Sequence, residues 1–142
     1  MNDIMNLFSL NGKNAVVTGA NTGLGQGICV ALAAAGAHVF GVARRSCDET
    51  AAKIAAEGGQ FTEVRADLSD FAAIDSILEQ VHAHADRIDI LVNNAGIIKR
   101  IPMTEMSAAQ FRQVIDVDLN APFIVAKSVI PDMIEQGGGK II

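Results

Sequence analysis

Short apolar runs of strand-forming residues alternate with helical patterns along the whole chain, and this alternation restricts the possible folds more than any other feature. We expect strands at residues 14–18, 38–42, 60–65 and 89–92, and the start of a fifth strand at 140–142. We expect helices at residues 24–35, 48–57, 70–86 and 107–136. Strict alternation indicates βαβ units, and therefore a parallel sheet with helices on both faces. The chain is thus expected to form a single α/β domain over residues 1–142, with a doubly wound parallel sheet.

Several helix ends are marked by capping residues. Asp48 and Asp70 are expected to cap the second and third helices, and Gly36 to end the first. Ser107 and Gln110 have the spacing of a capping box, and Pro122 should kink or divide the helix that follows. One apolar stripe of the third helix is expected to face the core, and its members are Phe71, Ile74, Ile77, Leu78 and Val81.

The charge and cysteine content exclude several classes of partner. With 16 acidic and 11 basic residues the net charge is −5, which disfavours nucleic acid or an anionic membrane as a partner. We see neither an apolar run that would span a bilayer nor a secretory signal. Cys29 is expected in the core and Cys47 as a loop thiol, and two cysteines make no disulfide framework. A reducing cytoplasm is the expected location.

Some charged and metal-ligating side chains are expected to have no role in a site. His82 and His84 are two residues apart on a helix and therefore face different directions, so no metal site is expected. Asp116 and Asp118 have the same spacing, and we interpret them as helix-surface charges.

A glycine-rich loop, Thr18-Gly19-Ala20-Asn21-Thr22-Gly23-Leu24-Gly25, joins the first strand to the first helix. Glycine permits a tight turn, a close approach of the backbone to a diphosphate, and close packing of helix on strand. A bound phosphate would meet free N–H groups at the positive end of the helix dipole. A glycine-rich turn without a ligand is the alternative, but the position between a buried strand and a helix favours a cofactor.

The loop and three later motifs together resemble the short-chain dehydrogenase/reductase family. The loop has the form Thr-Gly-x-x-x-Gly-x-Gly, Asp67-Leu68 follows the third strand, and Asn93-Asn94-Ala95-Gly96 follows the fourth. Asn120 is similar to the helix asparagine of the family's catalytic tetrad. The motifs occur in family order, and the resemblance implies a Rossmann-like fold and an NAD(P)-dependent oxidoreductase.

Within the family, three local segments look most like the 2-deoxy-D-gluconate 3-dehydrogenase subfamily. They are residues 8–13, 22–27 and 94–100. The resemblance implies a small-molecule substrate, a hydroxy or keto sugar acid. Enzymes similar to gluconate 5-dehydrogenase or to 3-oxoacyl-carrier-protein reductase share much of the pattern and stay open as alternatives.

The resemblance assigns a role to each matched residue. Asn21 and the backbone of residues 22–25 would line the diphosphate and the adenosine ribose. Asp67 and the Leu68 N–H would contact the adenine, although Asp67 could instead cap a helix. Residues 93–96 would lie against the ribose, Asn93 would tie neighbouring strands, or both. Asn120 would help to hold a water in the proton relay. The expected cofactor-binding residues are Thr18, Gly19, Asn21, Thr22, Gly23, Leu24, Gly25, Arg44, Asp67, Leu68, Asn93, Asn94, Ala95 and Gly96.

The choice between NAD and NADP depends on the end of the second strand. A carboxylate there binds the ribose 2′-hydroxyl of NAD, whereas an arginine accommodates the 2′-phosphate of NADP. The acidic position falls on Ala43, followed by Arg44 and Arg45, which favours NADP. Thr22, however, stands where many NADP enzymes of the family have a basic residue, and the sugar-acid subfamily generally uses NAD. Both cofactors therefore stay open.

Lys99 and Arg100 follow the Asn-Asn-Ala-Gly turn, close to where the substrate should lie. An anionic sugar acid needs a cation, and arginine can hold a carboxylate through two hydrogen bonds. Two solvated loop charges are the alternative.

The family's reaction uses a Tyr as general acid/base, a Lys that lowers its pKa and a Ser that orients the substrate. This chain contains no Tyr. We therefore expect a domain truncated near the start of the fifth strand, with an open apolar sheet edge and no activity by itself. A non-catalytic dinucleotide-binding or assembly module is the alternative. The complete enzyme is expected to be a homo-oligomer.

Overall fold

The computed structural model describes residues 4–142 and contains one parallel sheet of five strands. The strands are β1 (Asn14–Thr18), β2 (His38–Ala43), β3 (Gln60–Arg65), β4 (Ile90–Val92) and β5 (Lys140–Ile141). Their order in the sheet is β3-β2-β1-β4-β5, and every neighbouring pair is parallel. The expected Rossmann-like doubly wound fold is confirmed.

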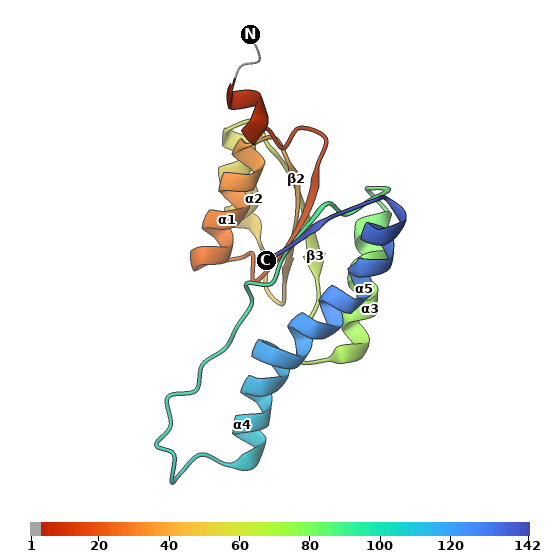
Figure 1. The fold of residues 1–142 in the computed structure, drawn as a ribbon. Helices are drawn as coiled ribbons and strands as arrows, with labels where there is room; N and C mark the ends of the chain where they lie inside the picture. The colour runs from red at the N-terminus through yellow and green to blue at the C-terminus, as the bar shows by residue number, and fades with distance from the viewer. Residues whose placement is uncertain (1–3) are drawn as a thin grey trace.

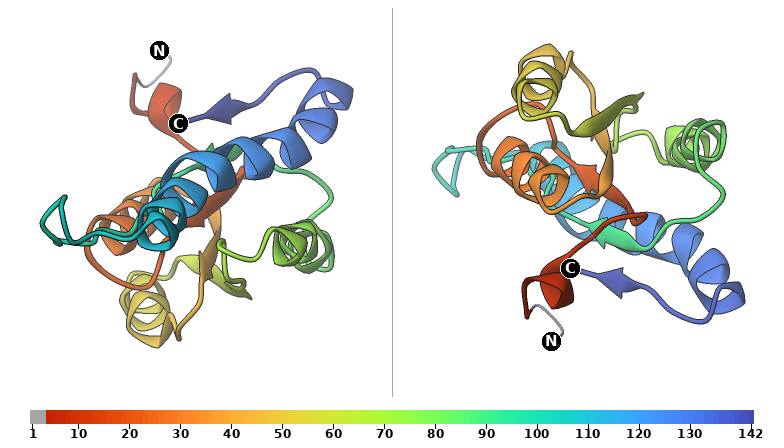
Figure 2. Two further views of the ribbon diagram at one scale, coloured as in Figure 1. Left: turned by 90° about the horizontal axis from the view of Figure 1, so that it is seen from below. Right: turned by 90° about the horizontal axis from the view of Figure 1, so that it is seen from above.

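Helices cover both faces of the sheet (Figures 1 and 2). The helical segments are η1 (Ile4–Phe8), α1 (Gly23–Ala34), α2 (Asp48–Ala56), α3 (Phe71–His82), α4 (Ala108–Ile115), the π-helix η2 (Asp116–Asn120) and α5 (Ala121–Glu135). Successive residues of β1 point to opposite faces. Ala15 and Val17 pack with α1 and α2, whereas Val16 packs with α3 and α5. The sheet is therefore buried between two apolar cores.

The capping predictions are confirmed at two helices and wrong at a third. The Asp70 carboxylate accepts a hydrogen bond from Ala72 N at 3.1 Å, and Ser107 with Gln110 forms the complete capping box. The N-cap of α2 is Cys47 rather than Asp48, because Asp48 is itself the first residue of the helix. Cys47 does precede the helix, but it is buried, and burial raises the pKa of its thiol to about 11.

The apolar stripe of α3 is narrower than predicted. Ile74, Ile77 and Val81 are buried, whereas Phe71 is 38% exposed. At about 100° per residue, Phe71 and Leu78 fall on the margin of the stripe that the other three define. The predicted long helix is divided, because the π-helix η2 separates α4 from α5 and Pro122 lies in the first turn of α5. A second proline, Pro131, lies inside α5.

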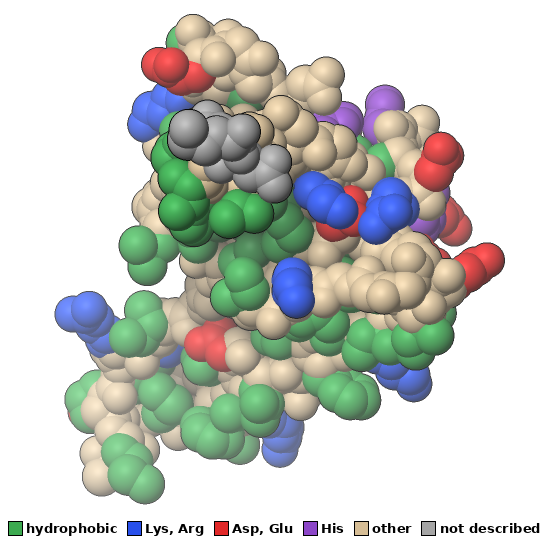
Figure 3. Space-filling model, turned by 45° about the horizontal axis from the view of Figure 1, so that its top comes forward, with side chains coloured by type: hydrophobic (Ala, Val, Ile, Leu, Met, Phe, Trp, Pro, Cys, Tyr) green, Lys and Arg blue, Asp and Glu red, His purple; other side chains and the backbone are tan. Residues whose placement is uncertain are grey.

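Apolar side chains lie on the surface as well as in the core. Figure 3 shows one face, where hydrophobic side chains gather and Lys and Arg are scattered. On the edge strand β5, the Ile141 side chain is 43% exposed, so this edge of the sheet is apolar, as expected. Association through this edge stays a prediction. None of the helices in the part of the chain that the structure describes is long and apolar enough to cross a membrane.

A buried carboxylate joins the beginnings of β1 and β4. Asp89 is 6% exposed, and its Oδ2 accepts a hydrogen bond from Asn14 N at 3.0 Å. Arg87 and Lys13 both pair with Oδ1. Burial alone would raise the pKa of Asp89, but the Asn14 N–H and the two cations offset it and lower this pKa below its ordinary value. Asp89 is therefore ionised at neutral pH and ties the two strands together.

We expect Asp89→Asn to lower the free energy of unfolding at pH 7 by about 1–3 kcal/mol, because one buried charge-assisted contact loses its acceptor. Since the pKa is lowered on folding, the carboxylate stabilises above its unfolded pKa and ceases to do so on acidification. The difference between variant and wild type should shrink below about pH 4. Urea unfolding at several pH values measures it, with the exposed Asp86→Asn as control. A difference independent of pH would contradict the assignment.

Candidate functional site

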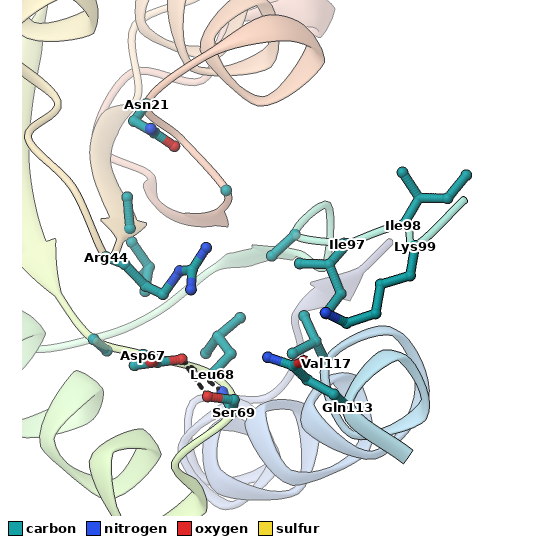
Figure 4. Close-up of a pocket in the computed structure, with 16 residues that line it drawn as sticks. Asn21, Arg44, Asp67, Leu68, Ser69, Ile97, Ile98, Lys99, Gln113 and Val117 are labelled. Atoms are coloured by element: carbon teal, nitrogen blue, oxygen red, sulfur yellow. Dashed lines mark hydrogen bonds between the residues drawn. The ribbon is translucent and has the colours of Figure 1, made fainter. Parts of the chain in front are cut away.

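A cavity of about 290 Å³ opens at the carboxyl ends of the strands. Ligands bind in this crevice in open α/β sheets. Figure 4 shows side chains from five segments directed around it. The lining residues are Gly19 and Asn21 after β1, Val42, Ala43 and Arg44 at the end of β2, Ala66 to Ser69 after β3, Ala95 to Lys99 after β4, and Gln113 and Val117 from α4 and η2.

The glycine loop forms one wall of the cavity through close backbone packing. Gly19 has a φ of 69°, which favours glycine, and a Cβ there would lie 2.9 Å from the Asn94 side chain. A Cβ on Gly25 would lie 2.0 Å from the Gly19 carbonyl oxygen. Gly23 also has a positive φ, 58°, but it faces open space. Glycine is therefore required at residue 25 for packing and at residues 19 and 23 for conformation.

The beginning of α1 has the form expected of an anion site. Its N-cap, Thr22, makes no side-chain capping hydrogen bond, and the first N–H groups of a helix have no partner within the helix. Leu24 is 82% exposed. Neither residue lines the cavity, nor do Gly23 and Gly25. The backbone of this turn, rather than its side chains, is available to a phosphate.

Thr18 and Asn94 join the glycine loop to the turn after β4. The buried Thr18 hydroxyl accepts hydrogen bonds from Asn94 N at 3.0 Å and Ala95 N at 2.9 Å, and donates to Val92 O. The Asn94 amide donates to Thr18 O at 3.0 Å. The side chain that ties strands is therefore Asn94, whereas Asn93 N donates to the carbonyl oxygen of Ile142, the residue directly after β5.

Thr18, Asn93 and Asn94 do not line the cavity, whereas Ala95 and Gly96 do. Thr18 and Asn94 thus hold the cavity wall that the next two residues form.

Asp67 lies in the cavity and does not cap α3. Its Oδ1 accepts hydrogen bonds from Ser69 Oγ at 2.7 Å and Ser69 N at 2.9 Å. These two bonds lower the pKa of Asp67, and the Arg44 guanidinium adds to the effect. The helix cap is Asp70, so the alternative role for Asp67 is wrong. Asp67 and the neighbouring Leu68 remain available to a ligand.

The end of β2 presents a cation to the cavity. Ala43 is buried, and the side chain of Arg44 points into the cavity from the strand end (Figure 4). Arg45 is exposed and does not line it. On the opposite side Lys99 reaches towards Gln113, whereas Arg100 is exposed outside the cavity. Of the two cations after the Asn-Asn-Ala-Gly turn, only Lys99 contributes to the cavity.

Asp116 and Asp118 lie on the helix surface as expected, Asp118 exposed and Asp116 half-buried, but each also makes a specific contact. Asp118 Oδ1 accepts a hydrogen bond from Ile97 N at 2.8 Å and so fixes the turn after β4. Asp116 Oδ1 accepts one from Asn120 Nδ2 at 2.9 Å. All three side chains belong to the π-helix η2, a kind of element that is frequent at functional sites.

Sequence reasoning missed Gln113 and Asp118. The pair Asp116 and Asn120 has the i,i+4 spacing at which helical side chains meet, so that contact could have been predicted. Nothing local marks the contact of Asp118, whose partner Ile97 is 21 residues away.

A metal site has no support in the described part of the chain. Residues 4–142 contain no group of three or more His, Cys, Asp or Glu side chains that could hold an ion. His82 instead contacts Asp132 of α5, with Nε2 and Oδ2 2.8 Å apart. This contact joins α3 to α5, away from the cavity.

Comparisons with known proteins agree with this geometry. Residues 13–142 match the short chain dehydrogenase family. A 2-dehydro-3-deoxy-D-gluconate 5-dehydrogenase of Dickeya dadantii (strain 3937) is 41% identical over 140 residues, which cover 98% of this chain and 55% of that protein. The chain thus spans about half the length of the curated relatives it matches.

Two solved structures are similar in sequence as well as in fold. A 2-keto-3-deoxy-D-gluconate dehydrogenase from Streptococcus agalactiae is 48% identical, with a TM-score of 0.80 and coverage of 94% of this chain and 51% of that one. A metagenomic short-chain oxidoreductase in complex with NADP is 36% identical, with a TM-score of 0.88 and coverage of 93% and 61%.

The motifs, the strand order and the matched residues all lead to one assignment. The glycine loop and the Asn-Asn-Ala-Gly turn meet at one end of the sheet, as the resemblance implies, and the family match extends from residue 13 to residue 142. The resemblance to sugar-acid dehydrogenases is confirmed by the relatives named above. The chain belongs to the short-chain dehydrogenase family.

Proposed function

We propose that this chain is the cofactor-binding part of an NAD(P)-dependent oxidoreductase that acts on a CH–OH group of a sugar acid such as 2-deoxy-D-gluconate. The observation that carries the proposal is the cavity where the ends of β1, β2, β3 and β4 meet, because it joins an arginine, a carboxylate and a glycine loop. A dinucleotide has a diphosphate, an adenine and two riboses. The arginine, the carboxylate and the glycine loop are groups that can hold these parts. The bound cofactor supplies the hydride-transfer chemistry.

The proposed contacts follow the order of the segments around the cavity. The backbone of residues 19–25 holds the diphosphate, and Asp67 with the Leu68 N–H holds the adenine. Ala95 and Gly96 lie against the ribose nearer the nicotinamide. Asn120, whose amide contacts Asp116, is proposed to hold a water in the complete enzyme.

The end of β2 supports NADP over NAD. Ala43 offers no carboxylate to a ribose 2′-hydroxyl, and Arg44 points into the cavity, where it can pair with a 2′-phosphate. A relative in the family has been solved in complex with NADP. Lys99 is proposed to attract the carboxylate of the sugar acid from the opposite side of the cavity.

Isothermal titration of the 142-residue chain with NADPH and NADH tests the proposal. Both should bind, and NADPH should bind more tightly, by about tenfold, because a charge-assisted hydrogen bond adds to the contacts. The chain has no Tyr to act as general acid/base, so we expect no formation of reduced cofactor when a sugar acid and NADP are added. If neither NADPH nor NADH binds, the proposed function is rejected. If the chain oxidises the sugar acid, only the expectation that the reaction needs a Tyr is rejected.

A further inference from the structure

Side chains of β3 hold the short segment between β2 and α2, residues 44–47. This segment bears Arg44, the cation that the end of β2 directs into the cavity. Within residues 4–142, no hydrogen bond joins this segment to the glycine loop or to the Asn-Asn-Ala-Gly turn. Its position is set instead by two charged residues, Glu63 and Arg65, whose roles the family motifs do not include.

Glu63 holds the far end of the segment. Its Oε2 accepts a hydrogen bond from Cys47 N at 2.6 Å, just where α2 begins. Its Oε1 pairs with Arg65 Nε. The Cys47 N–H first, and then the Arg65 side chain, lower the pKa of Glu63, so the carboxylate is ionised at neutral pH. The Glu63 side chain is 29% exposed, and its contacts are therefore partly shielded from water.

Arg65 holds the near end. Its Nη1 donates to the Arg44 carbonyl oxygen at 3.2 Å. The backbone of Arg65 is in turn fixed by Gln80 of α3, which accepts from Arg65 N and donates to Arg65 O, both at 3.1 Å. The chain of contacts runs from α3 through Gln80 and Arg65 to the backbone of Arg44.

The two ends of residues 44–47 are thus fixed by one ion pair on β3. A side chain on a fixed backbone loses less conformational freedom when it binds a ligand, and arginine contacts to phosphate depend on orientation. Arg65, whose Nε pairs with Glu63, does not line the cavity, whereas Arg44 does.

We propose that Glu63 and Arg65 are positioning residues that hold Arg44 against the 2′-phosphate and so set the preference for NADP over NAD. The inference rests on the proposed function, since it presupposes a dinucleotide in the cavity. It adds that the preference depends on two side chains that do not themselves contact the cofactor.

Two adenosine nucleotides isolate this effect: 2′,5′-ADP (adenosine 2′,5′-bisphosphate) and 5′-AMP, which differ by the 2′-phosphate alone. The ratio of their dissociation constants, measured by titration of the full chain, reports the phosphate contact. We expect wild type to prefer 2′,5′-ADP, and Arg44→Ala to reduce the preference by about tenfold. Glu63→Ala and Arg65→Met should each reduce it by about three- to tenfold while changing the affinity for 5′-AMP less than about twofold.

Glu63→Gln should retain part of the preference, because its amide oxygen can still accept the Cys47 N–H. The matched control is Glu79→Ala, an exposed carboxylate on α3, which should leave the ratio unchanged. Thermal unfolding shows whether each variant folds. If Glu63→Ala does not fold, Arg65→Met provides the test in its place.

The outcomes separate the two proposals. If wild type binds neither nucleotide, the proposed function fails and the inference fails with it. If wild type binds both equally, the proposed preference for NADP and this inference are overturned, while dinucleotide binding stands. If the two positioning variants weaken both nucleotides by the same factor, only the inference is overturned. A stronger preference in Glu63→Ala, from an Arg65 released towards the phosphate, would overturn it as well.

Discussion

Gly25→Ala is expected to destabilise the chain by roughly 2–3 kcal/mol and to abolish dinucleotide binding. A Cβ at this position would lie 2.0 Å from the Gly19 carbonyl oxygen and 2.5 Å from the Asn94 side-chain nitrogen. The first obstacle is backbone, so it cannot move aside as a flexible side chain can. Helix α1 would have to shift away from β1, and the glycine loop would lose the geometry proposed to hold the diphosphate.

Gly27→Ala provides the control within the same helix. Gly27 is exposed, and a Cβ there would meet nothing within 4 Å. Alanine at an open helical position should stabilise the chain by up to about 1 kcal/mol, since it restricts the unfolded chain more than glycine does. Urea unfolding gives both stabilities, and titration with NADPH gives both affinities. Equal effects of the two substitutions would show that packing at residue 25 is not the cause.

Much of the fold could be predicted because its signals are local. Gly36 ends α1 with a φ of 107°, a conformation that glycine adopts without strain, and Ser107 with Gln110 forms the expected capping box. The strand-helix alternation led to the parallel sheet. The errors are at margins, where one residue of offset matters: Cys47 rather than Asp48 caps α2, and Phe71 lies at the edge of its stripe.

The site was predictable where a motif is contiguous and not where a contact crosses the chain. Asn93 and Asn94 are adjacent, and side chains of adjacent extended residues point in opposite directions, so the sequence alone cannot say which of them ties the strands. The contacts of Asp118 with Ile97 and of Glu63 with Cys47 join different elements. They depend on how helices and strands are placed relative to one another, and no spacing in the sequence encodes that placement.

The second large effect is expected from Thr18→Val, which preserves the β-branched shape of a buried side chain but removes its hydroxyl. That hydroxyl accepts the N–H groups of Asn94 and Ala95 and donates to Val92 O. Without it, two N–H donors and a carbonyl lose a partner in a partly buried turn. An unsatisfied group costs about 1–3 kcal/mol, and water can reach some of this turn, so we expect a loss near 2 kcal/mol.

Thr18→Ser separates the hydroxyl from the methyl group, because serine can make the same three hydrogen bonds and loses only a methyl. It should retain most of the stability and of the affinity for NADPH, whereas Thr18→Val should weaken both, since Ala95 and Gly96 form part of the cavity wall. If serine is as damaging as valine, packing of the methyl and not the hydrogen bonds holds the turn. If Thr18→Val lowers stability but not affinity, the Thr18 hydroxyl does not position the turn after β4 against the cofactor. The Asn94 side chain must then position this turn, because its amide donates to Thr18 O independently of the hydroxyl.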